Sequence, residues 1–449
     1  MKHLLPKTCS ILFGLMATSL PTFARASAAA SSSHDSGAEP LTTVVTLVLG
    51  VGAAYLLAHF VVDGLQKRFL LNTNAEYIGL GILLGPAVAA VPAFHDLTPI
   101  APIIALATGW VGLLYGMELN LRKLLGTRDN SLRLALMDGA GVVIPVLFTT
   151  QWFLQAPILE SLGTDPLSRN DAWLCAWILA LTAWAGSSDA MSIVRRRYPQ
   201  KGPILETLKQ TAHLGDLFAI AGFGFLFCAF HQEVIPRTAL RAPTPVEWAA
   251  ITLGIGTGLG GLFTVFLGKE DAHANTLLPL VGIITFAAGA AFFLDLSALL
   301  VNLVLGVVLI NTAQQGNNVR KTLEGTVRPI SLILLVFAGA LWSPPPLWPT
   351  VVLSIGLIVL RLLGKVSFLW LATLGTSMRK DTFRGLIGQG HVAVAMALST
   401  KLVFHGTGID IVYTAILVSV VVHELVAPRL LKGLLVDSGL IRNEIAVEA

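Results

Sequence analysis

Residues 203–230 read PILETLKQTAHLGDLFAIAGFGFLFCAF, an apolar run long enough to cross a bilayer. The run nevertheless carries Glu206, Lys209, His213 and Asp216, at spacings of three, four and three residues. On a helix of 3.6 residues per turn these side chains share one face. Because charges at bilayer depth are costly and usually functional, the stripe predicts a water-filled funnel that ends at a deep carboxylate, Asp216. The alternative is a set of structural pairs, such as Glu206 with Lys209.

The whole composition is that of a membrane protein. Of the 449 residues, 54% are hydrophobic and 12% charged, with a mean hydropathy of +0.75, whereas a soluble domain carries about 25% charged residues. The sequence therefore predicts an all-α polytopic membrane protein, and its formal net charge of +4 gives no sign of nucleic-acid binding. We expect thirteen transmembrane spans: 41–62, 76–93, 100–118, 132–154, 172–194, 203–230, 246–267, 275–291, 293–311, 325–343, 349–374, 383–400 and 408–428.

The two ends of the chain predict export and membrane insertion. Residues 1–26 have the features of a signal peptide, with Lys2 and Lys7 before a short apolar centre and a small-x-small site that ends at Ala26. An uncleaved extra helix is the alternative. Residues 27–40 are then an exposed polar leader, 41–430 a transmembrane domain, and 431–449 a short cytoplasmic tail.

The loop charges predict the orientation. With thirteen spans and an external mature N-terminus, the loops on the cytoplasmic side carry 20 Lys and Arg residues and those on the external side carry 4. The positive-inside rule thus places the C-terminus in the cytoplasm, and we expect a bacterial inner-membrane location. The four external basic residues are Arg169, Arg237, Arg241 and Lys401.

Two spans are interrupted by small and polar residues. The fifth contains Ser187, Ser188 and Asp189 within WAGSSDA, and the twelfth contains Gln389 and His391 within GLIGQGH. Such stretches can unwind and offer carbonyls and hydroxyls to a cation, and a pair of them is typical of inverted-repeat transporters. The alternative is that the glycines only allow close helix packing.

Other polar residues in or near the spans have less definite roles. Arg361 lies in the middle of the eleventh span, where we expect it to neutralise a carboxylate or a helix end. Glu118 is expected to be an interfacial cap, and His59, Asp63 and Asp138 to be interfacial. The chain has no disulfide or zinc pattern and no phosphate-binding Gly-rich loop with a lysine, so neither an enzyme nor a cofactor is expected.

Six short motifs follow one another along the chain: EYIGLGILLGP at 76–86, LYGMEL at 114–119, SSDA at 187–190, Gly215-Asp216, GQGHVA at 388–393 and ELVAPR at 424–429. In this order they resemble the motifs of the cation/proton antiporter superfamily, specifically bacterial sodium/proton and potassium/proton exchangers with thirteen spans. The resemblance implies that 41–430 is an exchanger domain with core and dimerisation helices, an inverted-repeat fold and two crossed discontinuous helices. It also implies a homodimer and an aspartate, here Asp216, that binds cation and proton in turn.

The chain departs from the family pattern at the site itself. Gly215 stands where the family has Asp or Asn before the binding aspartate, His391 stands at the position of an acid, and 330–341 in the tenth span lacks the lysine of charge-moving members.

We therefore expect a secondary active antiporter that exchanges a monovalent cation, Na⁺ or K⁺, for a proton. Asp216 with Ser187, Ser188 and Asp189 is the expected ion and proton site, and one carboxylate at the paired motif predicts electroneutral exchange. The supporting or charge-compensating residues are His213, Glu206, Lys209, Arg361, Gln389 and His391. One rival is a non-transporting sensor or assembly module that kept the fold. An anion symporter is the other, against which the aspartates argue because they would repel the substrate.

Overall fold

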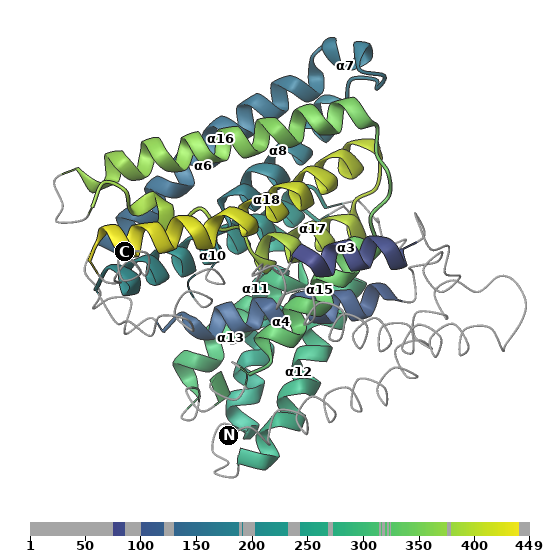
Figure 1. Cartoon of the computed structure of the whole chain (residues 1–449). Coiled ribbons are helices and arrows are strands. Elements are labelled where there is room, and N and C mark those ends of the chain that lie inside the picture. Colours follow the sequence, from purple (N-terminus) through teal and green to yellow (C-terminus); the bar gives the residue numbers. More distant parts are fainter. Residues whose placement is uncertain are drawn as a thin grey trace, which may run out of the picture.

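The computed structural model describes residues 75–85, 100–120, 130–187, 191, 203–231, 243–267, 273–313, 316, 319–320, 323, 325–374 and 379–439. The predicted signal peptide, leader and first span, together with Ser188 and Asp189, lie outside these residues, as does the end of the tail. Within the described residues every regular element is a helix, which confirms the predicted all-α class (Figure 1). The elements are α3 (Ala75–Leu84), α4 (Ala101–Glu118), α6 (Asn130–Gln155), α7 (Ile158–Ser161), α8 (Arg169–Trp184), α10 (Pro203–Ala229), α11 (Pro245–Leu267), α12 (His273–Phe293), α13 (Ala298–Thr312), α15 (Val327–Ala340), α16 (Leu347–Thr373), the 3₁₀ turn η3 (Thr382–Gly385), α17 (His391–Val403) and α18 (Thr407–Asp437).

Six described helices are long and apolar enough to cross a bilayer. Large apolar side chains point outward from them, including Phe148 and Trp152 on α6 and Leu363 and Trp370 on α16, as expected for surfaces in contact with lipid. The six spans are Ala101–Glu118, Ser131–Gln155, Ile204–Ala229, Pro245–Val265, Leu347–Thr373 and Thr407–Asp437.

The helices pack as two groups that meet along α10 and α17. The scaffold group contains α3, α4, α11, α12, α13 and α15, and the site group contains α6, α8, α10, α16, α17 and α18 (Figure 1). Glycines allow close contact within each group: a Cβ atom on Gly306 of α13 would lie 2.5 Å from the Leu113 carbonyl of α4, and one on Gly364 of α16 would lie 2.1 Å from the Gly141 carbonyl of α6. Close packing by glycine therefore occurs in both groups, and Gly385 and Gly388 of the interrupted twelfth span also lie close to neighbouring side chains.

The described helices differ from the predicted spans mainly at the interruptions. The fifth span is helical only to Trp184, after which 185–187 are not helical. The twelfth begins as the turn η3, continues as the non-helical segment 386–390, and becomes a helix only at His391. The last helix continues past the predicted end at 428 to Asp437. Both predicted breaks are thus confirmed, and the adjacent spans predicted at 275–291 and 293–311 are two separate helices.

Candidate functional site

The two interrupted helices cross, and their unwound segments touch at the crossing. The backbone N–H of Gly390 donates to the Gly186 carbonyl at 3.1 Å. Beside this contact a Cβ atom on Gly388 would lie 3.0 Å from that of Ser187, so the approach leaves little room for a side chain at position 388. Ser187 and Gln389 are buried here. The crossing predicted from the two breaks is therefore present, with the C-terminal end of α8 facing the segment that leads into α17.

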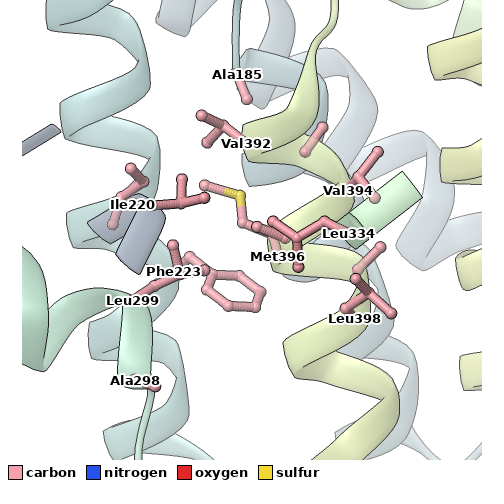
Figure 2. Packing of buried hydrophobic residues seen from close by; sticks show 14 of the residues in the cluster. Ala185, Ile220, Phe223, Ala298, Leu299, Leu334, Val392, Val394, Met396 and Leu398 are labelled. Carbon is pink, nitrogen blue, oxygen red and sulfur yellow. The ribbon is translucent and has the colours of Figure 1, made fainter. Parts of the chain in front are cut away.

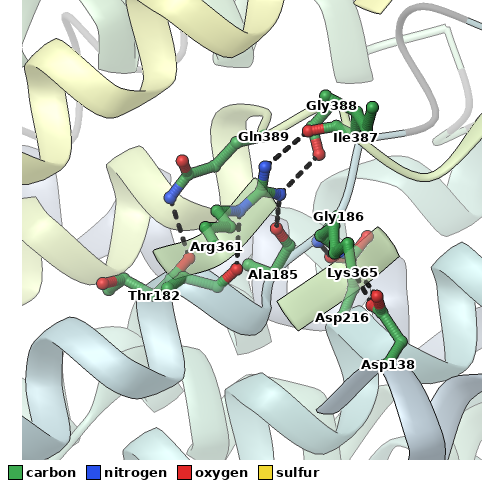
Figure 3. A network of polar contacts seen from close by, with 11 residues as sticks. Asp138, Thr182, Ala185, Gly186, Asp216, Arg361, Lys365, Ile387, Gly388 and Gln389 are labelled. Atoms are coloured by element: carbon green, nitrogen blue, oxygen red, sulfur yellow. Dashed lines mark hydrogen bonds and ion pairs between the residues drawn. The ribbon is translucent and has the colours of Figure 1, made fainter. Parts of the chain in front are cut away.

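A buried guanidinium holds both segments of the crossing. Arg361 of α16 is fully buried and donates from Nε to the Ala183 carbonyl at 2.7 Å and from Nη2 to the Ala185 carbonyl at 3.1 Å. It also donates to the carbonyls of Ile387 at 2.5 Å and Gly388 at 2.8 Å (Figure 3). A fixed positive charge thus satisfies carbonyls that the breaks leave without helical partners and complements the negative end of α8. This agrees with the predicted role of Arg361 at a helix end.

One turn further along α16, a second buried cation has a carboxylate partner. Lys365 Nζ lies 2.9 Å and 2.7 Å from the two carboxylate oxygens of Asp138 on α6, and both side chains are buried (Figure 3). The prediction that Asp138 is interfacial was wrong. Asp138 is instead buried, because the buried ammonium of Lys365 makes an otherwise costly buried carboxylate tolerable.

Asp216 reaches the crossing from α10 and is fully buried. Its Oδ1 accepts a hydrogen bond from the Gly186 backbone N–H at 2.6 Å, and its Oδ2 has no hydrogen-bond partner among the described residues (Figure 3). His213 and His391 are its electrostatic neighbours, and the Tyr115 hydroxyl is a hydrogen-bonding neighbour of the carboxyl group. A buried carboxylate oxygen without a donor is costly, and a proton or a cation would remove that cost.

The predicted stripe on α10 is graded in exposure. Glu206 and Lys209 are exposed, His213 is half-buried and Asp216 is buried, so polar access decreases stepwise toward the crossing. His213 Nδ1 lies 2.7 Å from Glu118 Oε2 of α4, which is an ion pair when the imidazole is protonated. Glu118 therefore joins the polar stripe, whereas the sequence predicted only an interfacial cap.

Beyond Asp216, toward the end of α10 predicted to be external, the interior is apolar. Ile220 and Phe223 of α10 lie near Val392 and Met396 of α17, and Leu299 of α13 packs against them from the scaffold group (Figure 2). All five are buried. In the part of the chain that the structure describes, the polar stripe on α10 thus approaches Asp216 from one side, and an apolar layer closes the other.

Gln389 links the crossing to α18. Its Nε2 donates to the Thr182 carbonyl at 2.9 Å, and its Oε1 accepts a hydrogen bond from Ser419 Oγ at 2.6 Å. Ser419 in turn lies 3.2 Å from Nδ1 of His423. An amide can both donate and accept, so Gln389 connects a helix-end carbonyl and a hydroxyl without adding a charge.

Trp184, the last residue of α8, fills the space beside Gly215. Its indole stacks on Phe218 of α10 with ring centroids 5.8 Å apart. A Cβ atom on Gly215 would lie 3.5 Å from the indole Nε1, and one on Gly139 of α6 would lie only 2.3 Å from the ring. The indole Nε1 is buried and has no hydrogen-bond partner among the described residues. The first position of the paired motif therefore adjoins an aromatic N–H donor.

The structure thus gathers most of the predicted residues. Asp216, Ser187, Arg361 and Gln389 lie at the crossing and His391 begins α17 beside it, while His213, Lys209 and Glu206 lead away from it. Sequence reasoning missed the parts played by a further set of residues: Asp138, Lys365, Glu118, Tyr115, Trp184 and Ser419. Within the described chain, no group of three or more His, Cys, Asp or Glu residues is arranged to hold a metal ion.

Comparisons with known proteins identify the fold. No protein-family model matches the sequence, and no curated protein matches it. One solved structure, of the sodium proton antiporter MjNhaP1 from Methanocaldococcus jannaschii at pH 8, has a TM-score of 0.58 at 15% identity and covers 90% of this chain and 99% of its own. A second, an electron-microscopy map of MjNhaP1, has a TM-score of 0.54 at 16% identity and covers 88% and 97%.

This chain therefore has the fold of a sodium/proton antiporter. The resemblance to the cation/proton antiporter superfamily, predicted from six short motifs, is confirmed at the level of the fold.

Proposed function

We propose that this protein is a secondary active antiporter that exchanges a monovalent cation, Na⁺ or K⁺, for a proton at Asp216. The observation that carries the proposal is the buried carboxylate itself, which has one oxygen without a hydrogen-bond partner among the described residues and lies where two unwound helix segments cross. A proton satisfies that oxygen as a carboxylic acid, and a dehydrated cation satisfies it as a ligand. The two cannot occupy it together, so their competition couples the two fluxes.

The neighbouring charges support a one-for-one exchange. Lys365 is neutralised by Asp138, and Arg361 has buried Glu424 as an electrostatic neighbour. Arg361 and Lys365 also have Asp216 as an electrostatic neighbour, but among the described residues Asp216 forms no ion pair with either cation. As the one carboxylate at the paired motif, Asp216 exchanges one unit of positive charge for another, and each cycle moves no net charge unless Asp189, His213 or His391 carries a second proton.

Around this site we propose Ser187, with Ser188 and Asp189, as further cation ligands, and His213, His391, Lys209, Glu206 and Gln389 as supporting groups. Hydroxyl and carbonyl oxygens are suited to a hard monovalent cation, and unwound helix segments offer them. We propose in addition a homodimer in a bacterial inner membrane, with the mature N-terminus outside and the C-terminus in the cytoplasm, on the basis of the loop charges and the antiporter fold.

The test is cation-driven proton movement in proteoliposomes. Na⁺, K⁺ or Li⁺ is added to vesicles with an imposed proton gradient, and the gradient should collapse with wild-type protein and persist with Asp216→Asn. Glu247→Gln, on a half-buried residue in the first turn of α11, is the matched control and should transport normally. Exchange by Asp216→Asn at the wild-type rate would refute the mechanism. A wild type that moves no cation and co-purifies with a soluble partner would favour the sensor or assembly module.

A further inference from the structure

Polar contacts join the two helix groups at the end of the molecule that the loop charges predict to be external. Ser343, just after α15 of the scaffold group, donates to Asp410 Oδ1 in the first turn of α18 at 3.2 Å. Lys401, in the last turn of α17, forms an ion pair with Asp410 and donates to Ser343 Oγ at 3.0 Å. These three residues, called the outer latch below, therefore tie the corner between α17 and α18 to the scaffold group.

Two further hydrogen bonds connect the same two groups nearby. Trp342 Nε1 donates to Thr414 Oγ1 at 3.1 Å, and the hydroxyl of Tyr413 donates to the Ala338 carbonyl at 2.7 Å. The ammonium of Lys401 also lies 5.9 Å from the centroid of the Tyr413 ring. The contact is therefore a connected set between the C-terminal end of α15 and the first two turns of α18.

The outer latch lies on the far side of the apolar layer from the polar stripe. Met396 of that layer and Lys401 both belong to α17, about one and a half turns apart. Asp216 is thus separated from this end first by buried apolar side chains and then by the latch. For water or a cation to reach Asp216 from here, the α17–α18 corner has to move away from α15.

We propose that the outer latch holds the site closed at this end and that its rupture is a step of the transport cycle; the inference rests on the proposed antiport. The pair suits a reversible contact. Lys401 and Asp410 keep 18% and 28% of their side-chain surface exposed, so each can be hydrated when they separate. Partly exposed ion pairs contribute little free energy, and the latch can therefore open at a modest cost.

The first test measures access and not transport. Met396→Cys is made in a chain whose three native cysteines are changed to alanine, and a membrane-impermeant thiol reagent is added from the side of the latch. Lys401→Gln and Asp410→Asn should each raise the labelling rate about fivefold, which corresponds to about 1 kcal/mol. The matched control breaks the ion pair between Arg384 and Asp437, which lies at the opposite end of α18, and should leave labelling unchanged.

The second test closes the latch. Ser343→Cys and Asp410→Cys are bridged by a short reducible thiol cross-linker, which should abolish labelling of Met396→Cys and cation/proton exchange, both restored by reduction. The latch would be overturned if labelling were unchanged in the latch variants. It would also be overturned if the protein with an intact bridge exchanged cations as fast as it does after the bridge has been cleaved. A protein whose labelling follows the latch but which exchanges no cation would uphold the latch and refute the proposed antiport instead.

Discussion

Replacing Arg361 should destabilise the protein more than any exposed charge does, because the guanidinium alone serves four backbone carbonyls at the crossing. Arg361→Met removes all four hydrogen bonds and leaves the four carbonyl oxygens buried without donors. A carbonyl that loses its partner costs about 1–3 kcal/mol. Taking about 1 kcal/mol for each carbonyl, the low end because these effects overlap, gives a loss on the order of 4 kcal/mol. That is a large part of the roughly 5–15 kcal/mol by which a folded domain is stable.

Arg361→Lys separates the charge from the geometry. Lysine keeps the positive charge but has three donors on a flexible stem and lacks the planar fork of arginine. It should therefore satisfy part of the set and lose about half as much stability as Arg361→Met. The comparison shows how much of the effect comes from the hydrogen-bond geometry and how much from a positive charge at the helix ends.

The measurement is thermal unfolding in detergent, followed by the loss of the monodisperse peak in size-exclusion chromatography after heating. At about 2–4 °C per kcal/mol, Arg361→Met should melt on the order of 10 °C below wild type, and Arg361→Lys should lie between them. Arg169→Met, at the exposed first residue of α8, is the control and should melt at the same temperature as wild type. A melting temperature for Arg361→Met close to that of the control would refute the assigned role.

Two other predictions concern ion pairs. Lys365→Met or Asp138→Leu alone should lower the free energy of unfolding by about 3–5 kcal/mol, because each leaves a buried charge unpaired. The double variant should recover most of that loss. Equal melting temperatures for the double and single variants would contradict this. At the surface, partial burial of Asp381 opposes its charge, but hydrogen bonds from Arg379 and the nearby arginines outweigh this and lower its pKa. Its contribution is therefore present above the ordinary carboxyl pKa and is lost as pH falls through the lowered value. The stability difference between wild type and Asp381→Asn, measured by melting from pH 7 to pH 3, should shrink over that range and not grow.

The features that the sequence predicted well are local ones. A carboxylate in an apolar run, a three-four-three spacing and a run of small residues inside a span are all visible without knowledge of the fold. They located Asp216, the polar stripe on α10 and both helix breaks. The run lengths located most ends of the described helices to within a few residues; the larger differences are the ends of α3, α8 and α18 and the start of α17.

The features that could not be predicted depend on contacts between distant segments. Asp138 and Lys365 are 227 positions apart, and nothing in either local sequence indicates the other, so Asp138 was assigned to the interface. Arg361 binds backbone carbonyls, which every residue carries and which leave no trace in the sequence. The position of Trp184 against Gly139 and Gly215 arises only when three helices pack together, so the sequence gives no sign of it.

The last prediction uses the contact between Trp184 and Gly215 to change the net charge that each transport cycle moves. A Cβ atom at Gly215 would be 3.5 Å from Trp184 Nε1, an ordinary contact, and the indole N–H there has no partner among the described residues. Gly215→Asp should therefore fit and place a second carboxylate beside Asp216, with the indole N–H as a ready donor. Two carboxylates that both release protons for one cation would leave one unit of charge uncompensated in each cycle.

Such a variant should respond to membrane potential, whereas the wild type should not. One charge moved across 100 mV corresponds to about 2.3 kcal/mol, so the cation gradient reached at equilibrium should change by about fifty-fold. The assay imposes a potassium/valinomycin potential on proteoliposomes and follows sodium-driven proton flux. Gly215→Asn is the matched control, because it adds nearly the same volume without a titratable group and should remain insensitive to potential. If Gly215→Asp transports and its flux is as insensitive to potential as that of Gly215→Asn, the carboxylate count does not set the stoichiometry, and the argument for electroneutral exchange from a single Asp216 is wrong.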